Sequence, residues 1–261
     1  MAKKLVHDKI LFTAFFVLVA VGLTMVYSAS AALARAGNQG PNSFLIKQSL
    51  AAGVGALSMF MMMHLDYRLL RRPGVVNGLL GGVIGLLVFV LFGPELNNTH
   101  RWFFVGGISV QPAELAKLAL IPFVAYQIER QQRRVRQREL LIPCGLAVGI
   151  MAALILLQPD LGTALLLGAT VFMLLFLAGL RWKYIVGATL AALPALYLLI
   201  GTVPYRRARL LAFLDPEKDP LGSGYQAHQS LIAVGSGGVW GLGLGESLQK
   251  LHFLPHPHSD F

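Results

Sequence analysis

Seven apolar runs of membrane length follow one another through the first 203 residues, separated by short charged or turn-forming segments. A run of about 18 or more apolar residues is long enough to cross the hydrocarbon core of a bilayer as an α-helix. We therefore predict an all-α polytopic membrane protein with about seven transmembrane helices. The predicted spans are Ile10–Ala29, Phe44–Leu65, Val75–Phe92, Val110–Ile128, Leu140–Leu157, Leu161–Leu180 and Tyr184–Val203.

The pattern changes after residue 204, where the chain becomes polar, charged and rich in glycine. We therefore divide it into transmembrane helices with short loops, 1–204, and a large loop with short interfacial helices, 205–261. Arginines and carboxylates gather in this loop, which favours a site for a polar, anionic ligand at the membrane surface. The charged residues are Arg206, Arg207, Arg209, Asp215, Glu217, Asp219 and Asp260.

The composition supports a membrane protein and argues against a nucleic-acid partner. The chain is 56% hydrophobic and 13% charged, whereas a soluble domain carries about 25% charged residues. Its net charge of +10 would suggest nucleic acid in a soluble protein. Here the positive-inside rule is a sufficient cause, because the cations lie mostly in alternate loops. The single cysteine, Cys144, lies in an apolar run and is expected to pack as a small hydrophobe.

The loops predict the orientation. Arginine and lysine are frequent in the loops on one side of the membrane, whereas the short loops of the other side hold only Arg35 and Arg101. This asymmetry predicts a cytoplasmic N-terminus and an extracytoplasmic 205–261. Nucleotide cofactors are absent outside the cell, so the glycine-rich segments GSGG and GLGLGES are not predicted to be nucleotide-binding turns. They also lack the preceding strand and the GK[ST] ending of such motifs.

The first apolar run has some features of a signal peptide, because lysines precede it and the small-residue segment SASAALARA follows. Its length of about 20 residues is that of a span rather than of a signal-peptide core. We therefore predict a retained first helix.

Ionisable residues open the fourth run, whose sequence is QPAELAKLAL. Placing an ionisable side chain within the membrane costs about 2.5–3.5 kcal/mol on insertion scales, so such residues are functional candidates. Gln111, Glu114 and Lys117 are spaced i, i+3 and i+6, so Glu114 and Lys117 can pair. Two interpretations stay open: a structural pair that locks two helices, or a polar cavity that opens outward beside Arg101 and Trp102.

A second polar cluster, QPDLG, lies between the fifth and sixth runs on the same predicted side. Proline and aspartate are typical turn residues, so a tight turn explains the segment. Alternatively, Asp160 holds a cation or a ligand hydroxyl.

Several segments together resemble the SEDS family of cell-wall polymerases, the FtsW, RodA and SpoVE group. They are spread along the whole chain, and two of them, MVYSAS and GLGLGESLQKL, look more like the division members than the elongation members. The matching segments are MVYSAS, HRWFFVGGISVQPAELAKL, QPDLGTA, DPEKDPLGSGYQAHQSLIAVGSGGVWGLGLGESLQKL and LPHPHSDF. The last departs from the family's usual LPEAHTDF at His256, Pro257 and Ser259. Relatives continue through about three more spans, so a C-terminally truncated chain is expected.

The resemblance implies a peptidoglycan glycosyltransferase that polymerises lipid II at the outer leaflet of the bacterial cytoplasmic membrane, at the division septum. It implies membrane lipid, lipid II, an undecaprenyl-linked glycan, a class B penicillin-binding transpeptidase and other division-complex proteins as partners. The family's essential aspartate corresponds to Asp260 and its polar pair to Glu114 and Lys117. No cofactor is certain, although a divalent cation, Mg²⁺ or Mn²⁺, would suit Glu114.

The reaction joins a sugar hydroxyl to an anomeric carbon with inversion and expels a lipid pyrophosphate. Asp260, placed by the turn at His258, is the candidate base. The candidate cations for the pyrophosphate are Lys117, Arg101, Arg206, Arg207 and Arg209, although the three loop arginines are equally explained by lipid head groups. Tyr225, Gln226 and Gln229 either line the sugar site or cap short helices. His252, His256 and His258 match no standard zinc motif, so no metal site is predicted there.

Two other classes of function remain open. A polar cavity with membrane-embedded Glu and Lys also suits a transporter that flips lipid II, although no inverted repeat is visible in the sequence. A non-catalytic scaffold that recruits the transpeptidase is the third possibility, and it predicts that Asp260→Ala leaves the function intact.

Overall fold

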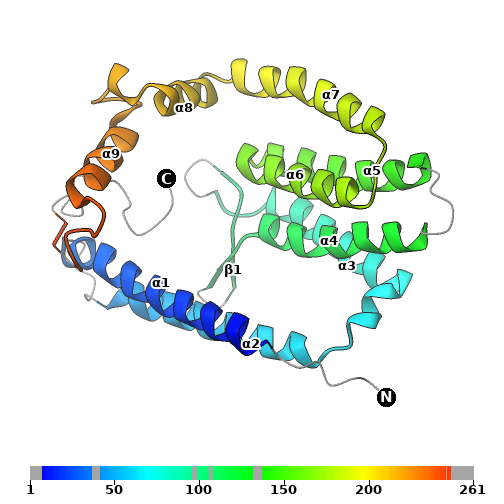
Figure 1. The fold of residues 1–261 in the computed structure, drawn as a ribbon, viewed down its shortest axis with the longest axis horizontal. Coiled ribbons are helices and arrows are strands. Elements are labelled where there is room, and N and C mark those ends of the chain that lie inside the picture. The colour runs from blue at the N-terminus through cyan, green and yellow to red at the C-terminus, as the bar shows by residue number, and fades with distance from the viewer. Residues whose placement is uncertain are drawn as a thin grey trace. The chain divides into compact units, whose positions relative to one another are not determined.

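The computed structural model describes residues 8–36, 42–95, 99–105, 108–131, 137–244 and 246–247 (Figure 1). It divides into two compact units: residues 66–192 form one, and residues 1–65 with 193–261 form the other.

The seven predicted spans correspond to seven long helices. Their boundaries differ from the predicted ones by a few residues, except at the end of α1, which extends seven residues beyond Ala29. The helices are α1 (Lys9–Ala36), α2 (Ser43–His64), α3 (Pro73–Val90), α4 (Pro112–Arg130), α5 (Gln137–Leu157), α6 (Leu161–Leu177) and α7 (Trp182–Gly201). Two short helices, α8 (Pro204–Leu214) and α9 (Tyr225–Gly237), follow in the polar C-terminal region, together with the 3₁₀ turns η1 (Tyr67–Arg71) and η2 (Pro216–Lys218).

Five of the helices in the described part of the chain are long and apolar enough to cross a membrane by length and composition: α1, α2, α3, α5 and α7. α6 is apolar but only 17 residues long. α4 has 19 residues, but they include Glu114, Lys117, Glu129 and Arg130. Among the seven long helices, α4 and α6 therefore do not meet this criterion. They are also the two helices at whose N-termini the sequence predicted polar site residues.

The core lies in the unit formed by residues 66–192, where α3, α4, α5 and α6 pack against one another. Each helix contributes one buried face with helical spacing, as Leu140, Cys144, Ala147, Met151 and Ile155 show on α5. Cys144 is fully buried among apolar side chains, which confirms its predicted role as a small hydrophobe. On α4 the buried face begins with three alanines, Ala113, Ala116 and Ala119, and such small residues let neighbouring helices approach closely.

A two-stranded hairpin precedes α4, and the sequence analysis missed it. β1 (Phe103–Val105) pairs antiparallel with β2 (Ile108–Val110), and Val110 therefore belongs to a strand rather than to the predicted fourth span. The α4 helix begins only at Pro112, which occupies its first turn. Proline is favoured there because its missing N–H would have no partner in the helix. The ring of Phe103 stacks on Phe89 of α3, with 5.3 Å between centroids.

In the other unit α1 and α2 pack as a pair, partly through Phe12 and Phe60, whose ring centroids lie 6.0 Å apart. Asp8 caps the start of α1, where its carboxylate accepts the backbone N–H of Ile10 at 3.0 Å. Most of their large apolar side chains face outward. This is expected of helices that lie in lipid, where apolar side chains need no protein partner.

The two faces of α6 give a matched test of this packing. Leu167 is 1% exposed within the core and its neighbour Leu166 is 51% exposed. We expect Leu167→Ala to lower the free energy of unfolding by about 2–4 kcal/mol, because it leaves a cavity. Leu166→Ala is expected to cost less than about 1 kcal/mol. Thermal unfolding of the two purified variants in the same detergent measures the difference, and equal losses would contradict the packing.

Candidate functional site

The Glu114–Lys117 ion pair lies in the first two turns of α4. Gln111 is the N-cap residue, and Glu114 follows in the first turn, where a carboxylate is favoured by the positive end of the helix dipole. Lys117 Nζ lies 2.6 Å from the Glu114 carboxylate, and the two side chains are 26% and 56% exposed. The pair therefore forms within one helix.

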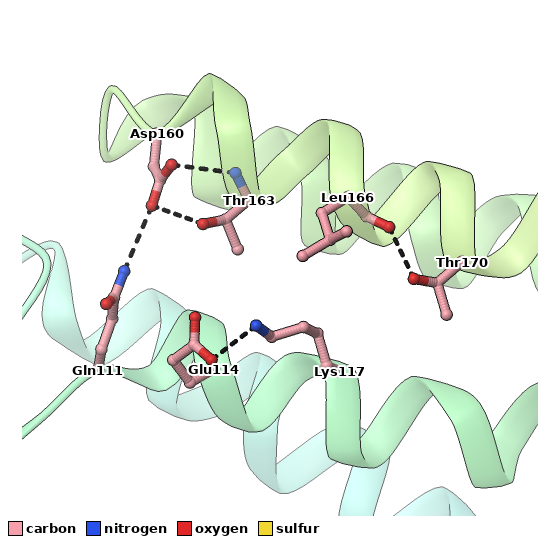
Figure 2. A network of polar contacts seen from close by, with 7 residues as sticks. All are labelled: Gln111, Glu114, Lys117, Asp160, Thr163, Leu166 and Thr170. Carbon is pink, nitrogen blue, oxygen red and sulfur yellow. Dashed lines mark hydrogen bonds and ion pairs between the residues drawn. The ribbon is translucent and has the colours of Figure 1, made fainter. Parts of the chain in front are cut away.

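Asp160 caps the start of α6 beside this pair (Figure 2). One carboxylate oxygen accepts the backbone N–H of Thr163 at 3.1 Å, and the other accepts the Thr163 hydroxyl at 2.9 Å. The second oxygen also accepts the side-chain amide of Gln111 at 3.3 Å. The turn predicted for QPDLG is confirmed, and the Asp160 carboxylate already has three hydrogen-bond donors within the protein.

Arg101 binds the same turn from the segment that precedes β1. Its Nε donates to the carbonyl oxygen of Gln158 at 2.8 Å, and one terminal nitrogen donates to the carbonyl oxygen of Pro159 at 2.5 Å. The guanidinium thus holds the end of α5 with two charge-assisted hydrogen bonds. Trp102, its neighbour, is partly buried.

Gln158 is a polar residue to which the sequence analysis assigned no role. Its side chain is fully buried at the end of α5, where Nε2 donates to the carbonyl oxygen of Leu87 at 3.4 Å. Its Oε1 has no hydrogen-bond partner in the part of the chain that the structure describes. The available signal was a glutamine that directly follows a long apolar run, two residues before an N-cap aspartate.

The α8 arginines, which belong to the other unit, are in different environments. Arg206 donates to the carbonyl oxygen of Leu199 at 2.9 Å, so it satisfies a C-terminal carbonyl of α7. Arg207 and Arg209 are exposed on α8. Of the three arginines, these two extend into solvent and are the better candidates for a head group or a pyrophosphate.

Tyr225, Gln226 and Gln229 lie in the first two turns of α9, each partly buried. The N-cap residue of α9 is Gly224, with no side-chain cap hydrogen bond. None of these three side chains therefore caps the start of α9. Their role in lining a site stays a prediction.

Asp219 fixes the turn that leads into α9. Its carboxylate accepts the backbone N–H of Ser223 at 2.8 Å, the Ser223 hydroxyl at 3.1 Å and the backbone N–H of Gly222 at 3.0 Å. These hydrogen bonds, that from the Ser223 backbone foremost, lower the pKa of Asp219 below its usual value. A Cβ at Gly224 would collide with the carbonyl oxygen of Pro216, so this close approach requires glycine.

The structure does not describe the site residues that were predicted near the C-terminus. Asp260 and His258, like His252 and His256, lie beyond the part of the chain that the structure describes. Among the described residues, no three His, Cys, Asp or Glu side chains are grouped closely enough to hold a metal ion.

The apolar helices and the ion pair at the start of α4 define a polytopic helical membrane protein with a polar site at the end of its core. The chain belongs to the FtsW, RodA and SpoVE family of cell cycle proteins, whose family model matches residues 8–261. This confirms the resemblance seen in the sequence.

Relatives named probable peptidoglycan glycosyltransferase FtsW are similar to this chain over nearly its whole length. The protein from Geobacter sp. (strain M18) is 40% identical over 98% of this chain and 70% of its own. That from Geobacter metallireducens is 39% identical over 98% of this chain and 68% of its own.

Solved structures show the same fold. A chain of a peptidoglycan synthase complex described as coordinating polymerization and crosslinking is 38% identical, with a TM-score of 0.70, over 90% of this chain and 67% of its own. The rod shape determining protein RodA of Thermus thermophilus is 27% identical, with a TM-score of 0.56, over 91% of this chain and 88% of its own.

The lowered pKa of Asp219 predicts how the α9 turn responds to acid. A carboxyl group with a lowered pKa in the folded state stabilises that state above its unfolded pKa of about 3.9. This stabilisation is lost as the pH falls through the folded pKa. Hydrogen exchange of residues 219–228, corrected for its intrinsic pH dependence, should therefore show less protection at pH 3 than at pH 6. Asp219→Asn should remove most of this difference, whereas Asp215→Asn should retain it.

Proposed function

We propose that this protein is a peptidoglycan glycosyltransferase that polymerises lipid II into glycan strands at the outer face of the cytoplasmic membrane during cell division. The proposal rests on the 40% identity, over 98% of the chain, to a relative named probable peptidoglycan glycosyltransferase FtsW. A cation within an apolar helix bundle supports it, since the leaving group of this reaction is a pyrophosphate.

In this proposal Asp260 is the general base that removes the proton from the attacking sugar hydroxyl. As that hydroxyl oxygen bonds to the anomeric carbon, the bond to the pyrophosphate oxygen breaks on the opposite face, and the configuration inverts. The leaving group gains negative charge, so a cation near it stabilises the transition state more than the ground state.

Lys117 is the proposed cation, and Glu114 positions it. At 2.6 Å the carboxylate holds the ammonium group at one place on α4. A preorganised charge is more effective than a mobile one, because the protein does not have to reorganise during the reaction. Arg207 and Arg209 are placed in this proposal at the head group of the approaching lipid-linked substrate, since both are exposed on α8.

The proposed partner is a class B penicillin-binding transpeptidase, which would cross-link the new strands. The similarity to a chain of a peptidoglycan synthase complex supports this pairing. The proposal places residues 205–261 on the extracytoplasmic side, where lipid II is presented, and the positive-inside distribution of the loop arginines and lysines supports that side.

The first test is polymer formation from labelled lipid II by the protein co-purified with its transpeptidase. Asp260→Asn removes the base with little change in size, and we expect glycan polymer to fall by about 10²- to 10⁴-fold. Glu217→Gln, which neutralises an exposed carboxylate of η2, should leave polymer unchanged. Lipid II movement without polymer would instead indicate a flippase. A folded, partner-bound wild type that makes no polymer and moves no lipid would indicate a scaffold.

The second test concerns the cation. Lys117→Met keeps the length of the side chain and removes its charge, so we expect kcat to fall by about 10²- to 10³-fold. Lys218→Met makes the same change at an exposed position of η2 and should have no effect. Turnover of labelled lipid II at saturating concentration measures both, and equal turnover in the two variants would contradict the role of Lys117.

A further inference from the structure

Three polar residues among the candidates from the sequence are bound to other parts of the protein. Arg101, Gln111 and Asp160 are chemically suited to contact a sugar or a pyrophosphate. In the structure Arg101 donates to carbonyl oxygens of the α5–α6 turn, Gln111 donates to Asp160, and Asp160 accepts from Thr163 at the start of α6. We infer that they are positioning residues, which fix α4 against α6 and thereby set the place of Lys117; this inference rests on the proposed function.

The Gln111–Asp160 hydrogen bond joins two helix N-termini. Gln111 is the N-cap residue of α4, and Asp160 is the N-cap residue of α6. The two helices begin at the same end of the site and run in the same direction (Figure 2). Their positive dipole ends therefore lie close together, and the Asp160 carboxylate between them offsets the repulsion while it accepts the Gln111 amide.

Arg101 holds the other side of the same turn. It donates to the carbonyl oxygens of Gln158 and Pro159, the two residues that follow α5. The buried Gln158 side chain binds the carbonyl oxygen of Leu87 on α3. The turn that carries Asp160 is thus tied to α3, to α4 and to the segment before β1.

The consequence reaches Lys117 through the geometry of α4. Gln111 and Lys117 are six residues apart on one rigid helix, which corresponds to a rise of about 9 Å. The Lys117 and Glu114 side chains lie on the side of α4 that faces α6 (Figure 2). A shift of α4 along α6 would therefore move the ammonium group by the same amount, and displacements of about 1 Å at a reacting centre can cost about 10²-fold in rate.

A pair of substitutions that reverses the Gln111–Asp160 hydrogen bond tests the inference. Gln111→Glu removes the donor and places two carboxylates together. Adding Asp160→Asn restores a donor opposite the new acceptor, and asparagine remains a good N-cap residue. Gln127→Glu, which makes the same change near the far end of α4, is the control.

We expect Gln111→Glu to lower kcat for lipid II polymerisation by about tenfold, with KM changed by less than about twofold. The double variant should recover to within about threefold of the wild type, because the two changes are coupled through one contact. Gln127→Glu should match the wild type. A double variant as weak as Gln111→Glu or weaker, or a KM that rises with each substitution, would overturn the inference in favour of substrate contact.

Arg101 provides an independent comparison, which decides the matter if Gln111→Glu does not fold. Lysine keeps the charge of arginine but lacks the planar fork that reaches two carbonyl oxygens. We therefore expect Arg101→Lys and Arg101→Gln to lower kcat alike, with KM unchanged. If Arg101→Lys kept nearly the kcat and KM of the wild type while Arg101→Gln had a raised KM, the charge of Arg101 would contact the pyrophosphate. That result would overturn the inference.

The two proposals can fail separately. A wild type that makes no polymer would refute the proposed function. In that case the binding of labelled lipid II to the wild type, Gln111→Glu, the double variant and Arg101→Gln decides the inference. Equal dissociation constants, with a thermal midpoint that the double variant recovers, would support positioning. Binding that weakens with each substitution would overturn it.

Discussion

A charged side chain among apolar helices must be neutralised by a partner close by, and the organisation of the α4 end of the core depends on this constraint. Lys117 has its counter-ion one turn earlier on the same helix, at 2.6 Å. The pair forms within α4, and the buried face of the same helix consists of small and apolar residues. Ala113, Ala116 and Ala119 form the part of that face nearest the pair. The result is a cation held beside a closely packed helix interface.

Helix N-termini supply the other polar groups of the site. The first backbone N–H groups of a helix have no partner within it, and both α4 and α6 begin at this end of the core. Asp160 meets part of this need at α6, and it also accepts the side chain of Gln111 from the start of α4. One carboxylate thus caps α6 and also connects it to the start of α4.

Much of the fold could be predicted from the sequence because the hydrophobic signal is long and strong. Seven apolar runs predicted seven long helices. The segment QPAELAKL was correctly placed at the start of a helix and QPDLG at the turn between two helices. The β1–β2 hairpin was missed, because its two strands have three residues each and Val110 reads as the beginning of an apolar run. The buried Gln158 was also missed, since periodicity alone does not distinguish a core glutamine from one that ends a helix in solvent.

The sequence by itself determined the class of protein, the number and approximate limits of the long helices, and the residue types available for chemistry. These properties depend on local composition and on the length of apolar runs, which the hydrocarbon thickness of a bilayer selects. Only the tertiary structure decided which polar atoms meet. Arg101 and Gln158 are 57 residues apart in the chain, and Gln111 and Asp160 are 49 apart. Hydrogen bonds over such separations require the packing of α4, α5 and α6, which no local pattern records.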